Sequence, residues 1–124
     1  MHMSLPLTGL RVLDLSRVLS GPYCTMLLAD MGAEVIEVEF LGEGDLTRGK
    51  GDPESEERGG QPVFFDLNHN KKSLTLNLKA ESGKEIFKRF VETADVLMEN
   101  YRPDVMDRLG LGYSVLSQIN PRLI

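Results

Sequence analysis

The stretch from residue 10 to residue 39 constrains the fold most, because it contains a strand pattern, a helix pattern and a second strand pattern in succession. Residues 10–15 are short and largely apolar, which predicts a buried strand. Residues 22–31 predict a helix that begins at Pro22, whose missing N–H needs no partner in the first turn. Residues 33–39 predict the second strand. A strand–helix–strand unit of about thirty residues joins two parallel strands by a right-handed crossover, so we expect an α/β fold.

The rest of the chain continues this alternation of strands and helices. Residues 73–78 alternate between leucine and polar residues and predict a third strand. Ser82 and Glu85 have the spacing of a capping box, which predicts a helix over residues 83–93 with Ser82 as its N-cap. We further expect a fourth strand at 95–99, a short helical turn after Pro103, a short helix at 113–120 and the start of a fifth strand at 122–124.

Two polar stretches are interpreted as irregular structure. Residues 40–62 hold six glycines and two prolines, and we expect a long loop that includes the acidic run 52–57 as a solvated segment. Residues 68–72 have the composition of a polar turn, in which Lys71 and Lys72 are expected to be solvated.

A chain of 124 residues suits one domain, in which residues 1–3 resemble a cloning remnant. The chain ends as an apolar strand begins, so we expect it to be the truncated front part of a longer protein. The net charge of −5 argues against a nucleic-acid partner, which calls for a basic surface. No apolar run reaches the roughly 18–20 residues of a membrane span, so no membrane partner is expected. The single cysteine, Cys24, has no partner for an internal disulfide, which favours a cytoplasmic location.

The carboxyl ends of the predicted strands define the candidate site, because open parallel sheets bind ligands at that edge. Residues 16–22 follow the first strand, Phe40 the second, Lys79 the third, and residues 100–102 the fourth. These segments bring polar, cationic and aromatic groups to one edge. Cations suit phosphates and an aromatic ring suits a base, so the composition favours a nucleotide-like ligand.

Other chemistries have weaker support in the sequence. Glu37 and Glu39 end the second strand, where a dinucleotide-binding fold keeps its ribose-binding acid, but the glycine fingerprint G-x-G-x-x-G is missing. His69 has no partner at metal-ligand spacing, so we expect no metal site. We interpret Cys24 as a buried, inert thiol. No serine–histidine–aspartate or paired-carboxylate arrangement can be argued from the spacing of residues.

Five segments, taken in order, resemble one family. They are GLRVLDLSRVLSGPYCTMLLADMGAEVIEVE, GDLTRG, NHNKKSLTLNLK, ADVLMENYRPDVMDRLGLGY and NPRLI. The chain resembles the class III coenzyme A transferases, the carnitine dehydratase and bile-acid-inducible F group, which also includes the 2-methylacyl-CoA racemases. The resemblance covers residues 9–124, and several motifs in the correct order make it specific.

The resemblance implies an α/β fold with an open, mainly parallel Rossmann-like sheet and helices on both faces. Residues 7–124 would form the N-terminal part of the large, CoA-binding domain, in a homodimer whose two chains interlock. Acyl-CoA would bind at the strand ends, with Lys79, Arg102 and Arg108 suited to its phosphates and Tyr101 to its adenine. The positions implied to contact coenzyme A are Leu19, Ser20, Leu76, Asn77, Leu78, Lys79, Asn100, Tyr101, Arg102 and Arg108.

Two residues depart from the family pattern. Phe40 stands where the transferases that use formyl- or oxalyl-CoA have an arginine, so a phosphate contact is expected to be lost there. Glu37 stands where a lysine is common.

The resemblance also implies the reaction, which moves coenzyme A between an acyl-CoA and a carboxylic acid. The catalytic aspartate, which attacks the thioester, is expected beyond residue 124, so this chain alone is expected to be inactive. One alternative is an α-methylacyl-CoA racemase, with a histidine and an aspartate as acid and base, also beyond this chain. Another is an inactive CoA-binding or subunit-interaction fragment.

Overall fold

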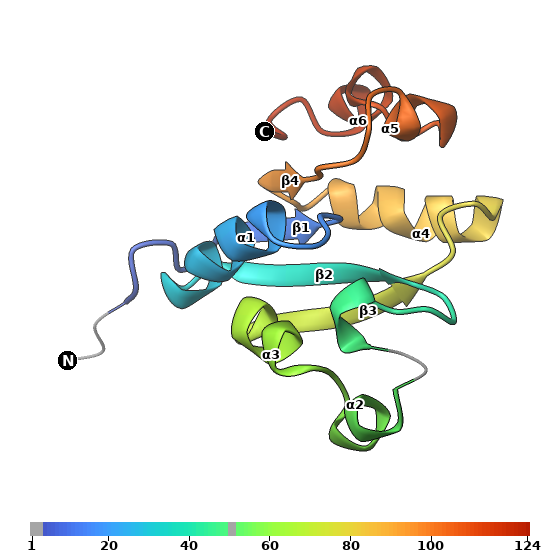
Figure 1. Cartoon of the computed structure of the whole chain (residues 1–124). Coiled ribbons are helices and arrows are strands. Elements are labelled where there is room, and N and C mark those ends of the chain that lie inside the picture. Colours follow the sequence, from blue (N-terminus) through green and yellow to red (C-terminus); the bar gives the residue numbers. More distant parts are fainter. Residues whose placement is uncertain (1–3, 50–51) are drawn as a thin grey trace.

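The computed structural model describes residues 4–49 and 52–124 of the chain. Within these ranges it contains a four-stranded sheet in the order β3-β2-β1-β4, and every neighbouring pair is parallel (Figure 1). This confirms the predicted α/β fold with an open parallel sheet. The strands are β1 (Arg11–Asp14), β2 (Glu34–Phe40), β3 (Lys71–Leu76) and β4 (Val96–Met98).

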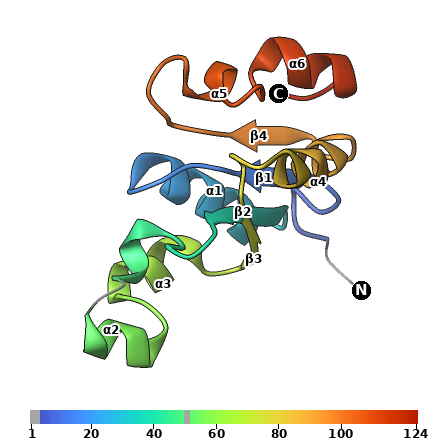
Figure 2. The same ribbon diagram turned by 90° about the vertical axis from the view of Figure 1, so that its right-hand side faces the viewer.

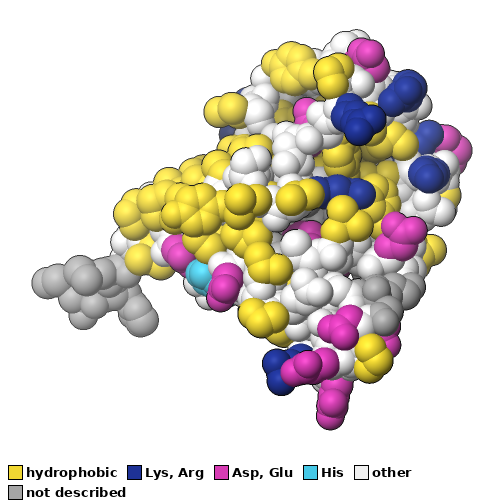
Figure 3. Space-filling view, viewed as in Figure 1, with side chains coloured by type: hydrophobic (Ala, Val, Ile, Leu, Met, Phe, Trp, Pro, Cys, Tyr) yellow, Lys and Arg dark blue, Asp and Glu magenta, His cyan; other side chains and the backbone are white. Residues whose placement is uncertain are grey.

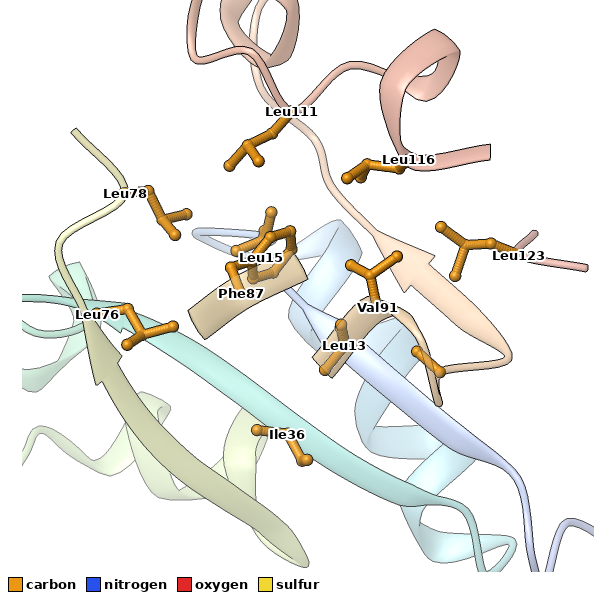
Figure 4. Packing of buried hydrophobic residues seen from close by; sticks show 11 residues of the cluster. Leu13, Leu15, Ile36, Leu76, Leu78, Phe87, Val91, Leu111, Leu116 and Leu123 are labelled. Atoms are coloured by element: carbon orange, nitrogen blue, oxygen red, sulfur yellow. The ribbon is translucent and has the colours of Figure 1, made fainter. Parts of the chain in front are cut away.

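Helices cover both faces of the sheet, as Figure 2 shows. Helix α1 (Ser20–Asp30) lies on one face and α4 (Glu81–Val91) on the other. Alternation along β1 explains the two layers, since successive side chains of a strand point to opposite faces. Val12 packs in the small apolar cluster that includes Ala29 of α1, whereas Leu13 packs in the larger cluster around Phe87 of α4 (Figure 4).

The prediction of a long loop over residues 40–62 is wrong in part. It contains a turn of 3-10 helix, η1 (Leu46–Arg48), then α2 (Pro53–Arg58) and the start of α3 (Pro62–Asn68). The acidic run is therefore mostly helical, and Asp52 is the N-cap of α2, where its side chain accepts a hydrogen bond from the Ser55 amide. Proline is the first residue of both helices, which is a helix-start signal that the glycine content obscured. Lys50 and Gly51 of the expected loop lie outside the described residues.

Two predicted helix starts are also corrected. Helix α4 begins at Glu81 with Ala80 as its N-cap and no side-chain cap, so Ser82 is not the N-cap. Helix α1 begins at Ser20, which makes Pro22 its third residue rather than its first. Proline fits there because the N–H groups of the first turn have no intrahelical acceptor.

Strand β3 begins two residues earlier than predicted, so Lys71 and Lys72 lie in the strand rather than in a solvated turn. Only Lys72 is exposed, with 69% of its side chain accessible against 1% for Lys71. The Lys71 ammonium lies 3.0 Å from the Asp14 carboxylate and also donates to the Pro22 carbonyl and the Asn68 side chain. This buried ion pair connects β3 with β1, α1 and α3.

The C-terminal part packs against β4 and α4. It contains α5 (Val105–Arg108) and α6 (Tyr113–Ile119), and no strand is assigned at 122–124. Ile124 nevertheless pairs with β4 as a parallel strand does, because its N–H donates to Asp95 and its carbonyl accepts from Leu97. No helix of the described part of the chain is long and apolar enough to cross a membrane.

Gly83 sets how closely α4 approaches the end of β3. A Cβ atom at this position would lie 2.0 Å from the Asn77 carbonyl oxygen. We expect Gly83→Ala to lower the free energy of unfolding by about 1–3 kcal/mol, the usual cost of overpacking, which outweighs the better helix propensity of alanine. Ser82→Ala, the control, should change it by less than about 0.5 kcal/mol. Denaturant unfolding measures both, and the opposite order of effects would restore Ser82 as the N-cap.

The buried ion pair gives a second prediction. Lys71→Met leaves the Asp14 carboxylate buried without its cation, and removing one partner of such a pair costs about 3–5 kcal/mol. Lys72→Met, the same substitution at the next residue, removes only an exposed pair with Glu34 and should cost less than about 1 kcal/mol. Thermal and denaturant unfolding of the two variants measures the difference. Equal stabilities would contradict a structural role for Lys71.

Candidate functional site

The four strands end at one edge of the sheet, because all of them are parallel. Phe40 pairs with Leu76, and Asp14 pairs with Met98, so the ends of β2 and β3 and those of β1 and β4 lie side by side. In Figure 3 several Lys and Arg side chains lie on the right of the molecule, the side toward which the strands run, and a band of hydrophobic side chains lies on the left. Asp and Glu side chains also lie on the right of this view, so this side of the molecule carries charges of both signs.

The turns after β1 and β4 are joined directly. The Asn100 side chain accepts a hydrogen bond from the Arg17 amide and donates one to the Arg17 carbonyl, each at 2.8 Å. Asp14 shapes the same turn, since its carboxylate accepts from both the amide and the hydroxyl of Ser16. Gly21 is needed here, because a Cβ atom at that position would lie 2.2 Å from Ser16. The glycine of the Ser-Gly-Pro segment thus permits a close approach of α1 to the turn.

Leu19 and Ser20 lie where this turn becomes α1. Leu19 is the N-cap of the helix, Ser20 is its first residue, and both are exposed. Tyr101, after β4, is half-buried, and this burial raises the pKa of its hydroxyl although the nearby Arg17 opposes the rise. The structure thus brings Asn100 and Tyr101 together with the β1 turn.

The segment after β3 has two kinds of side chain. Leu76 and Leu78 are buried in the main core, where Leu78 is only 2% exposed, so a ligand at the edge would meet only their backbone (Figure 4). Asn77 and Lys79 are exposed, and the Asn77 side chain accepts a hydrogen bond from the Lys79 amide. Of the four predicted positions, two therefore have side chains that are free to contact a ligand.

Arg102 and Arg108 are both exposed, the first in the loop after β4 and the second at the end of α5. Within residues 4–49 and 52–124, neither they nor Lys79 has an ion-pair partner. A hollow of about 360 Å³ adjoins this loop and is lined by Arg102 but not by Arg108. Its lining also includes Glu99, Asp104 and Asp107, so the hollow itself is a poor phosphate site.

The face of the sheet under α1 and α3 carries two carboxylates with opposite pKa shifts. Burial, and then the charges of Glu39 and Asp45, raise the pKa of Glu37 to about 8. Burial would also raise the pKa of Glu39, but hydrogen bonds from Arg48 and Ser73 outweigh it and lower the value to about 2. Both side chains are buried, so neither is available to a ribose.

The remaining candidates form no second site. His69 is exposed and interacts with Asp30 at 3.1 Å. No group of three or more His, Cys, Asp and Glu side chains in the described ranges is arranged to hold a metal ion. Cys24 lies in α1 and is half-buried rather than buried.

Sequence reasoning placed Arg17 in the segment 16–22 at the strand-end edge but not among the positions implied to contact coenzyme A. Its guanidinium carbon lies 3.6 Å from the centre of the Phe40 ring and 5.4 Å from that of Tyr101. Arg17 is the first cation after the predicted strand at residues 10–15, which is the signal that could have identified it. Arg17 lies over Phe40 because the ends of β1 and β2 are in contact, and this contact exists only in the tertiary structure.

Three comparisons with known proteins find similarity to the same family of CoA-transferases. Residues 7–124 match the family described as CoA-transferase family III. The acetyl-CoA:oxalate CoA-transferase of Acetobacter aceti is 49% identical to this chain over 120 residues, which are 96% of this chain and 30% of that protein. The formyl-CoA:oxalate CoA-transferase of Rhodopseudomonas palustris is 47% identical over 122 residues, which are 98% of this chain and 28% of that protein.

The fold has a similar solved structure. A CAIB/BAIF family protein from Brucella suis superposes with a TM-score of 0.85 at 41% identity, over 98% of this chain and 32% of that chain. The present chain therefore spans less than a third of the length of each of these proteins.

Glu37 gives a prediction with a definite sign. Its pKa is about 8 in the folded state against 4.5 unperturbed, so between these values the folded state binds a proton that the unfolded state releases. Stability should therefore fall as pH rises through this window. Glu37→Gln should reduce that decline, leaving above about pH 6.5 the part due to His69, whose pKa Asp30 also raises, whereas Glu92→Gln, at an exposed carboxyl after α4, should retain it in full. Melting temperatures across the window measure this, and an undiminished decline in Glu37→Gln would contradict the assignment.

Proposed function

The chain belongs to CoA-transferase family III, and on this basis we propose that it supplies the coenzyme A-binding edge of an enzyme that moves coenzyme A between an acyl-CoA and a carboxylic acid. One observation carries the proposal. Lys79 and Arg102 are exposed in the segments that follow β3 and β4, Arg108 is exposed at the end of α5, and none of the three has an ion-pair partner in the described ranges. Unpaired cations at such an edge suit the phosphates of coenzyme A.

The other strand-end residues take complementary parts in this proposal. The half-buried ring of Tyr101 offers a surface for the adenine, and Asn100 holds the two turns beside it. Leu19 and Ser20 are exposed beside the turn after β1. The backbone at Leu76 and Leu78, with the exposed side chain of Asn77, provides the polar contacts next to Lys79. Together these residues bind and orient the cofactor portion of the substrate.

The reacting groups are proposed to come from outside these residues. The family resemblance implies an aspartate nucleophile beyond residue 124, and an interlocked homodimer. Two relatives named above act on oxalate, so a small dicarboxylic acid is the acceptor we propose. The chain's own part is then to hold the thioester substrate in place. The reaction between the thioester and the nucleophile thereby becomes effectively unimolecular.

The activity is tested on the full-length protein that carries this sequence. Incubation with acetyl-CoA or formyl-CoA and oxalate should give oxalyl-CoA, measured by chromatography, while omission of oxalate should abolish the product. Exchange of the α-proton of a 2-methylacyl-CoA, without any transfer to an acid, would assign the racemase reaction instead.

Binding of coenzyme A tests the proposed edge directly. We expect Arg108→Ala to weaken it about tenfold or more, since a charge-assisted contact contributes roughly 1.5–3 kcal/mol. Arg89→Ala is the matched control, because Arg89 is also exposed but lies near Arg11, at the opposite end of the sheet. It should change affinity less than twofold at moderate salt. Calorimetric titration measures both variants, and equal affinities would remove Arg108 from the site.

A further inference from the structure

The Arg17 side chain contacts residues from two other strand ends, and one of its nitrogens has no hydrogen-bond partner in the described part of the chain. Its guanidinium lies over the Phe40 ring at 3.6 Å and near the Tyr101 ring at 5.4 Å, and both rings belong to other strand ends. Its Nη2 atom is buried and has no hydrogen-bond partner among the described residues. No carboxylate in the described part of the chain forms an ion pair with it.

The backbone around Arg17 is held firmly. The Asn100 side chain bonds both the amide and the carbonyl of Arg17. The next residue, Val18, has φ +70°, a left-handed conformation that is unfavourable for a β-branched residue. Such conformations persist where the surrounding structure imposes them, and they are concentrated at ligand-binding sites. The turn is therefore fixed in a costly conformation that directs Arg17 across the ends of β2 and β4.

The Nη2 group of Arg17 lacks an acceptor. The two rings can hold the guanidinium by its face, and the Tyr101 hydroxyl accepts from another of its N–H groups, but neither ring satisfies Nη2. A buried donor without a partner is unfavourable, and an anionic oxygen would satisfy it. Phosphate suits the guanidinium best, because its oxygens match the planar fork of donors.

We propose that Arg17 binds a phosphate oxygen of coenzyme A and so supplies the positive charge at the end of β2, where this chain has Phe40. This inference rests on the proposed function. The phenyl ring of Phe40 has no charge of its own, but it carries the Arg17 guanidinium on its face. The cation thus comes from the turn after β1. The half-buried Arg17 side chain meets the ligand beside the two rings.

The test uses the full-length protein and two substitutions, Arg17→Met and Arg17→Lys, with Arg89→Met as the control. Calorimetry measures the affinity for coenzyme A, dephospho-coenzyme A and pantetheine, and circular dichroism confirms that each variant is folded. We expect Arg17→Met to bind coenzyme A about tenfold or more weakly and pantetheine unchanged. Arg17→Lys should lose less, because it keeps the charge without the fork, and Arg89→Met should match the wild type.

Each outcome decides between alternatives. A loss confined to coenzyme A assigns the 3′-phosphate, and an equal loss with the dephospho ligand assigns the pyrophosphate; both support the proposal. Unchanged coenzyme A affinity in both folded Arg17 variants overturns it while the proposed function stands. A rise confined to the KM for the acid acceptor also overturns this proposal and leaves the proposed function standing, because Arg17 would then bind the acceptor's carboxylate. A wild-type protein that binds no coenzyme A overturns the proposed function, and this inference with it.

Discussion

The rest of the structure depends on the interactions of the Asp14 carboxylate at the end of β1. It accepts hydrogen bonds from Ser16 in the following turn and from Thr25 in α1, and it pairs with the Lys71 ammonium of β3. Lys71 in turn bonds Asn68 of α3. One buried anion thereby fixes the crossover helix, the edge strand and the turn at the candidate site. A buried ion pair adds little net stability, but its geometry is specific because each partner must be satisfied.

The two faces of the sheet consequently differ in character. The face under α4 is apolar and contains most of the core, so it provides most of the hydrophobic stabilisation. The face under α1 and α3 carries charged groups that are paired locally, as Glu39 is with Arg48. Glu37 is the exception, since its strongest charged neighbours are carboxylates and it is protonated near neutral pH. Asp14 lies on this face and accepts hydrogen bonds from Ser16, so the charged face is connected directly to the turn after β1.

Much of the candidate site could be predicted from the sequence, because strand ends in a parallel sheet are neighbours whatever the side chains are. Asn100 and Tyr101 do lie beside the first turn. The burial of Leu76 and Leu78 follows from their alternation in the predicted strand, and this restricts these two residues to backbone contacts. The stacking of Arg17 on Phe40 could not be predicted, because it depends on how closely the turn after β1 approaches the end of β2.

The sequence by itself determined the four strands, the helices α1, α4, α5 and α6, the parallel sheet and the family, because these follow from local periodicity and from motifs in a fixed order, but it missed α2 and α3. It misjudged residues whose environment is set by distant contacts. Lys71 has the composition of a solvated turn, but it is buried because Asp14, more than fifty residues earlier, supplies its counter-ion. Ser82 fits a capping box, but α4 begins one residue before it, and Gly83 lets the helix pack against Asn77. Tertiary packing decided these positions, because burial and close approach depend on residues that local patterns do not contain.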